Sequence, residues 1–91
     1  MAASVDKYRF TPHAILEMER RGIDRPIVER VLANPEQRYH VRLGRDVLQS
    51  RILFDDKVYL VRVFVDTKQE PAEVITAYRT SNVVKYWRGG A

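Results

Sequence analysis

The first third of the chain has apolar residues at the spacing of amphipathic helices. Thr11-Pro12 predicts a helix start, because a hydroxyl suits the N-cap and proline at the first helical position loses no hydrogen bond. The residues that follow give the helix one apolar stripe, formed by Ala14, Ile15 and Met18. Gly22 is expected to end this helix in a left-handed conformation.

A second helix is predicted directly after the first. Asp24 is its expected N-cap, Pro26 lies in its first turn, and Asn34-Pro35 ends it. Its buried face is expected to consist of Ile27, Val28, Val31 and Leu32. Because only Gly22-Ile23-Asp24 joins the two helices, they are expected to form a helical hairpin.

From Gln37 onward, apolar residues recur at every second position and no longer with the helical period, which indicates strands. In the first strand the apolar set is Tyr39, Val41 and Leu43, and the polar set is Arg38, His40 and Arg42. Turns at Gly44-Arg45 and Asp55-Asp56-Lys57 separate the next strands, and Ala72–Thr80 is the fourth. Ser81 is the expected N-cap of a short final helix.

These elements predict one α+β domain over residues 1–91. An N-terminal helical hairpin packs on one face of a four-stranded antiparallel sheet, and a short helix follows at the C-terminus. The strand Ala72–Thr80 is expected in the interior of the sheet. The residues expected beneath the helices are Leu48, Ile52, Val61, Val63, Ile75 and Ala77.

Composition narrows the classes of function. The formal net charge of +4 favours an anionic partner. The chain has no cysteine, which excludes disulfides and thiolate metal sites and favours a cytoplasmic location. No apolar run approaches the ~18 residues of a membrane helix, so no membrane partner is expected. The two histidines lack a metal-binding spacing, so neither a metal nor a cofactor is expected.

The polar alternates of the predicted strands are mostly cationic. If the apolar set meets the helices, the opposite face carries these cations, with Thr76, Tyr78 and Thr80 beside them. Such a face suits single-stranded nucleic acid, since cations bind phosphates and aromatic rings stack on bases. A solvated sheet face without a ligand is the alternative. The candidate RNA-binding residues are Arg38, His40, Arg42, Arg51, Arg62 and Lys85.

The end of the last strand carries candidate catalytic chemistry. Metal-independent RNA cleavage needs a base, an acid and a donor for the phosphorane. His13 or His40 offers an imidazole, and Tyr78–Ser81 offers hydroxyl groups. We expect His13 to converge with Tyr78–Ser81 in one cleft, with Arg79 or Arg21 as the cation. The alternative is that His13 only braces its helix.

Two motifs at the ends of the chain resemble the DUF4258 family of small bacterial proteins. The first is Phe10-Thr11-Pro12-His13-Ala14 with Met18, Arg21-Gly22-Ile23 and Asn34-Pro35; the second is Ala77–Ser81 with Lys85-Tyr86-Trp87. The order of elements resembles RelE/ParE and BrnT toxins of type II toxin–antitoxin systems. This resemblance implies a RelE-like fold, a metal-independent ribonuclease acting on mRNA or tRNA, and an antitoxin partner. The implied catalytic residues are His13, Arg21, Tyr78, Arg79, Thr80, Ser81 and Tyr86.

The sequence leaves three classes of function open. A toxin-like ribonuclease is the first, and a non-catalytic module that binds RNA or a protein partner is the second. The third is an enzyme acting on a small molecule. It is disfavoured because the sequence has no glycine-rich phosphate loop, nucleophile elbow or metal constellation.

Overall fold

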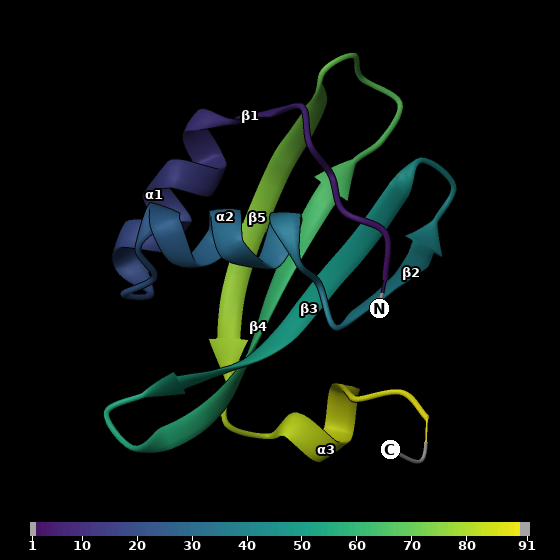
Figure 1. The fold of residues 1–91 in the computed structure, drawn as a ribbon. Coiled ribbons are helices and arrows are strands. Elements are labelled where there is room, and N and C mark those ends of the chain that lie inside the picture. Colours follow the sequence, from purple (N-terminus) through teal and green to yellow (C-terminus); the bar gives the residue numbers. More distant parts are fainter. Residues whose placement is uncertain (1, 90–91) are drawn as a thin grey trace.

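The computed structural model describes residues 2–89 as one five-stranded sheet with two helices on one face (Figure 1). The strands lie side by side in the order β1-β5-β4-β3-β2. In chain order the elements are β1 (Tyr8–Phe10), α1 (Pro12–Arg20), α2 (Arg25–Ala33), β2 (Gln37–Arg42), β3 (Arg45–Phe54), β4 (Lys57–Asp66), β5 (Ala72–Thr80) and α3 (Val83–Tyr86).

The predicted N-terminal hairpin on a four-stranded antiparallel sheet is wrong. The short strand β1 precedes the helices and pairs in parallel with β5, so the sheet has five strands and is mixed. Tyr8 lies opposite Ala72 and Phe10 opposite Val74. Helices α1 and α2 therefore lie between strands, and β5 lies inside the sheet between β1 and β4. The fold remains α+β. Strand β1 was not predicted because its three residues are too few to show an alternating apolar pattern.

The start of α1 also fixes that helix to the sheet. The Thr11 hydroxyl accepts a hydrogen bond from the Ala14 N–H at 3.1 Å, which is the expected N-cap. The same hydroxyl donates to the Val74 carbonyl of β5 at 3.0 Å. Gly22 ends the helical region with a φ of +65°, as predicted. One threonine thus begins the helix and positions it over β5.

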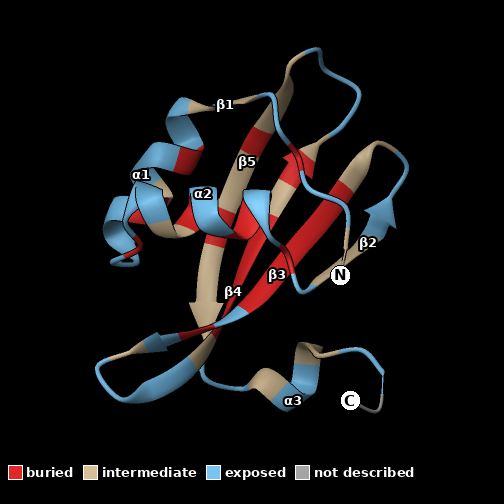
Figure 2. Ribbon diagram, viewed as in Figure 1, coloured by how far each residue is buried: buried red, intermediate tan, exposed pale blue. Residues whose placement is uncertain are grey.

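The core lies between the two helices and the sheet, where Figure 2 shows the buried residues along β3, β4 and β5. Leu48, Val63 and Ala77 are fully buried there, as expected. Ile75 is not part of this cluster. A bulge in the β4–β5 pairing leaves it as the extra residue, and Val74 takes its place in the core.

The face of the sheet opposite α1 and α2, here the far face, is partly covered by the C-terminal segment 82–89. The Gln49 side-chain amide donates to the Tyr86 carbonyl at 3.1 Å. The Arg88 N–H donates to Gln37 Oε1 at 3.1 Å, and Gln37 Nε2 donates to the Arg88 carbonyl. Helix α3 begins after Asn82 instead of the expected Ser81 and has no buried residue. Polar contacts and ring contacts, not apolar burial, hold this segment to the far face.

Candidate functional site

From Arg38 to His40, strand β2 presents its side chains to the faces opposite to those predicted. Arg38 lies on the helix side, where its Nε binds Asp46 at 2.8 Å and its Nη1 donates to the Ala3 and Ser4 carbonyls. Tyr39 instead reaches Arg62 on the far face. The expected face for Arg38 and His40 is therefore wrong, because a change of one residue in phase exchanges the two faces of a strand.

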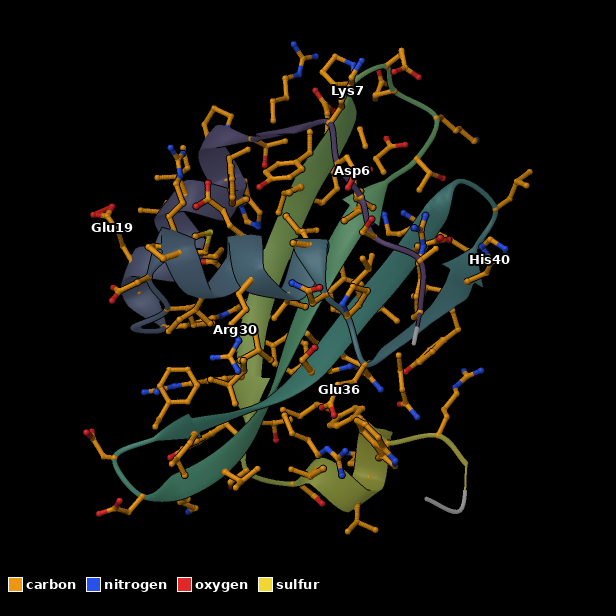
Figure 3. The ribbon with its side chains drawn as sticks, in the orientation of Figure 1. Asp6, Lys7, Glu19, Arg30, Glu36 and His40 are labelled. Carbon is orange, nitrogen blue, oxygen red and sulfur yellow. The ribbon has the colours of Figure 1, made fainter. Side chains whose placement is uncertain are left out.

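Asp46 is a buried carboxylate held by two of the predicted RNA-binding residues. It is 3% exposed and binds Arg38 and the His40 Nδ1, the latter at 2.5 Å. Burial raises the pKa of Asp46, but the hydrogen bonds and charges of Arg38 and His40 outweigh burial and lower it overall. His40 itself is 86% exposed at the outer strand β2 (Figure 3). The carboxylate therefore fixes one ring nitrogen and leaves the rest of the imidazole accessible.

The far face is organised around Arg62, which is only 7% exposed. Its Nε donates to Gln49 Oε1 at 2.8 Å, and its Nη1 and Nη2 donate to the hydroxyls of Tyr78 and Tyr39, each at 2.7 Å. Gln49, Arg62 and Tyr78 are direct partners across β3, β4 and β5. Within residues 2–89, no carboxylate forms an ion pair with this guanidinium.

Aromatic rings surround the same guanidinium. Its central carbon lies 4.4 Å from the ring centre of Tyr86 and 5.3 Å from that of Phe64. The Tyr78 ring stacks on Phe64 with centres 6.0 Å apart. Burial raises the pKa of Tyr78, in opposition to the neighbouring Arg62 charge. The phenol therefore stays protonated and neutral at physiological pH.

A pocket of ≈ 360 Å³ opens above Arg62, and we call it the Arg62 pocket. Its wall contains cations and rings but neither aspartate nor glutamate. Arg88 lies 3.6 Å from the centre of the Tyr39 ring, and the Lys85 amine lies 5.3 Å from that of Tyr86. The lining residues are Tyr39, His40, Val41, Arg62, Phe64, Lys85, Tyr86, Trp87 and Arg88.

Two further predicted RNA-binding residues, Arg51 and Arg42, lie outside the pocket wall. Arg51 is on β3, where it pairs with Glu36 at 2.9 Å and stacks on the Trp87 ring at 4.1 Å. Arg42 is exposed beside the β2–β3 turn. Of the six predicted residues, the structure places His40, Arg62 and Lys85 in the pocket wall.

Several predicted catalytic residues lie around β5, on both faces. Arg21 donates to the Ala77 carbonyl at 3.0 Å, and its guanidinium lies 6.0 Å from the Tyr78 ring centre. Arg79 faces the helix side, where it stacks on Phe54 at 4.4 Å. The Thr80 hydroxyl accepts from the Asn82 N–H, and Ser81 is exposed. The rings of Tyr78 and Tyr86 both contact the Arg62 guanidinium, whereas Arg79 lies on the other face of the sheet.

His13 does not converge with the Tyr78–Ser81 segment. It is exposed in the first turn of α1, which Thr11 fixes at Val74. Thr80 lies about 20 Å further along β5, at ~3.3 Å per residue. The predicted cleft between them is therefore not formed. Sequence reasoning also missed three residues of the pocket wall, Tyr39, Phe64 and Arg88. The sequence has no acidic residue from Ala77 onward, and this was the signal that could have indicated Arg88.

The family comparison gives a match over most of the chain. The model of a domain of unknown function, DUF4258, matches residues 10–83. The chain belongs to the DUF4258 family. Because the DUF4258 match ends at Val83, the pocket residues Lys85 to Arg88 lie beyond it. No curated protein and no solved structure matches the chain, and no finding supports the expected similarity to RelE/ParE or BrnT toxins.

Residues 2–89 contain neither a candidate membrane-spanning helix nor a candidate metal site. None of the helices between residues 2 and 89 combines the length and apolarity needed to cross a membrane. Over the same residues, no three histidine or carboxylate side chains lie close enough together to hold a metal ion.

Proposed function

We propose that this protein binds single-stranded RNA on its far face, through the Arg62 pocket. The observation that carries this proposal is a buried arginine whose hydrogen-bond partners are all neutral. A buried charge is costly unless it is compensated, and in most proteins a carboxylate provides the compensation. Here a phosphate of the ligand would complete the site.

The aromatic residues of the pocket support RNA as the ligand. Tyr39, Tyr86 and Phe64 offer ring faces beside the cations, and unpaired bases stack on such rings. Lys85 and Arg88 extend the positive charge from Arg62 to the pocket rim. A duplex does not present its bases for stacking, so we expect single strands to bind more tightly.

Salt dependence tests this proposal. Binding of a fluorescent oligouridylate should weaken as salt rises, because each phosphate contact releases counterions. With three cations in the pocket, Arg62, Lys85 and Arg88, we expect a slope of log affinity on log salt of about −2, at ~0.7 per contact. Anisotropy titrations at several salt concentrations measure the slope, and an RNA duplex of equal length is the control. Failure of the chain to bind any nucleic acid would instead favour a protein-binding module.

A metal-independent, toxin-like ribonuclease is the second candidate, favoured by the His40–Asp46 pair. Asp46 orients the His40 imidazole, and an oriented imidazole can transfer a proton near neutral pH. His40 lines the Arg62 pocket from the edge strand β2, but Asp46 holds its ring on the helix side. In this candidate the RNA therefore crosses that edge, so that one phosphate meets the imidazole and the Arg62 guanidinium. Only the ribonuclease candidate implies an antitoxin as a protein partner.

Cleavage assays decide between binding and catalysis. If the ribonuclease candidate is right, RNA incubated with the protein and a chelator is cut, and His40→Ala slows cutting by roughly a hundredfold. His13→Ala is the matched control and should cut at the wild-type rate, since His13 lies outside the pocket. If the wild-type protein does not cut the RNA, the ribonuclease candidate is wrong and only the binding function remains.

A further inference from the structure

We infer that Arg62 and the Tyr39 hydroxyl form a subsite for a phosphate group within the Arg62 pocket. This inference rests on the proposed RNA binding and names the ligand group recognised there. The same chemistry would accept the phosphate of a free nucleotide or inorganic phosphate. The experiment below therefore compares these sources.

The hydrogen-bond donors of this subsite are already held in place. A guanidinium has five N–H groups, and Arg62 uses three of them on Gln49, Tyr78 and Tyr39. Those bonds fix the plane and depth of the guanidinium, so little side-chain entropy is lost when an anion binds. The N–H groups that remain have no hydrogen-bond acceptor within residues 2–89.

The Tyr39 hydroxyl is the second hydrogen-bond donor of the phosphate subsite. Its oxygen accepts from Arg62 Nη2 at 2.7 Å, so its own proton must point elsewhere. In the described part of the chain, no acceptor takes that proton. Because the guanidinium polarises the phenol oxygen, the O–H is a stronger donor than an isolated tyrosine. Arg88 stacks on the same ring, which holds the ring in position.

Nearby carboxylates do not compete for these donors. Glu36 is bound to Arg51 at 2.9 Å, which lowers its pKa by hydrogen bonding against the effect of burial. Asp46 is bound to Arg38 and His40 on the helix side. The cations of the pocket thus face no internal anion, and Lys85 and Arg88 add positive charge at its rim.

NMR titration tests the subsite with defined ligands at constant ionic strength. Backbone amides of Tyr39, Arg62 and Tyr86 should shift on addition of inorganic phosphate or uridine monophosphate, and much less with uridine. Tyr39→Phe removes one O–H and keeps the ring, so we expect it to weaken phosphate binding roughly tenfold. Tyr59→Phe is the matched control, because Tyr59 packs against Phe54 on the helix side and should bind phosphate normally.

The possible results separate this inference from the proposed function. Equal phosphate affinity in Tyr39→Phe and wild type, or no shift with phosphate at all, would overturn the subsite. If oligouridylate still binds in that case, RNA binding stands without it. If phosphate binds with the expected Tyr39 dependence but RNA does not, the subsite stands and RNA is the wrong ligand. The NMR spectrum of each variant also reports whether it is folded.

Discussion

Replacing Arg62 by methionine is expected to weaken single-stranded RNA binding by roughly a hundredfold, because it removes the buried cation that meets the phosphate. The domain should remain folded. Methionine fills most of the same volume, and no carboxylate is left buried without its partner when the Arg62 charge is removed. The partners left behind, Gln49 and two tyrosine hydroxyls, can donate and accept among themselves. Anisotropy titrations and thermal melts measure the two effects separately.

Arg51→Met is the matched control for this variant. Arg51 was also a predicted RNA contact, but it is bound to Glu36 and lies outside the pocket lining. Its loss should change RNA affinity only a few-fold. Arg62→Lys keeps the charge and loses the fork of donors, so its affinity should fall between those of wild type and Arg62→Met. Unchanged RNA affinity in Arg62→Met would refute the proposed interface.

Leu48→Ala is expected to lower the free energy of unfolding by about 3 kcal/mol. Leu48 is fully buried in β3 beneath the helices, so the shorter side chain leaves a cavity that the surrounding core only partly fills. Urea denaturation followed by circular dichroism gives the change. A domain of this size has only about 5–15 kcal/mol of stability, so the loss is a large fraction of it.

Leu43→Ala is the same substitution at a surface position. Leu43 is 90% exposed in the β2–β3 turn, so we expect a change within about 0.5 kcal/mol. The sequence alone assigned both leucines to apolar faces of strands, and only the structure separates them. Comparable destabilisation by the two substitutions would show that the core is not where the structure places it.

The parts of the fold that could be predicted are those with local chemical signals. Thr11 with Pro12 and the φ of Gly22 determine the ends of α1, and each depends on its own residue. The turn at Asp55 and Asp56, where both residues have positive φ, is determined in the same local way. Such features need no knowledge of the rest of the chain.

The errors arose where the partner of a residue decides its position. In β2, Tyr39 and Arg38 both suit a half-buried strand. The choice between faces depends on Asp46 in the adjacent strand β3 and on Arg62 in β4, the next strand beyond it. In β5, the bulge that excludes Ile75 exists only in the pairing with β4. Neither partner can be read from the local pattern.

The candidate site was predicted only in part for the same reason. Arg62, Tyr78 and Tyr86 were named from their residue types, but their common contact depends on three separate elements. His13 was expected to converge with Tyr78–Ser81 at the end of β5 nearest Thr80. The Thr11 bond to Val74 places it at the opposite end.

The parallel pairing of β1 with β5 has a consequence for the order of folding events. Arg9 and Glu73, which pair across these strands, are 64 residues apart in sequence. Contacts between such distant residues form slowly, because a long loop must close first. The β2–β5 meander, in contrast, joins neighbours through short turns and can assemble from local contacts. We therefore expect the cross-strand row of Gln49, Arg62 and Tyr78 to form before β1 and Thr11 attach the helices to the sheet, and the core to close in the last step.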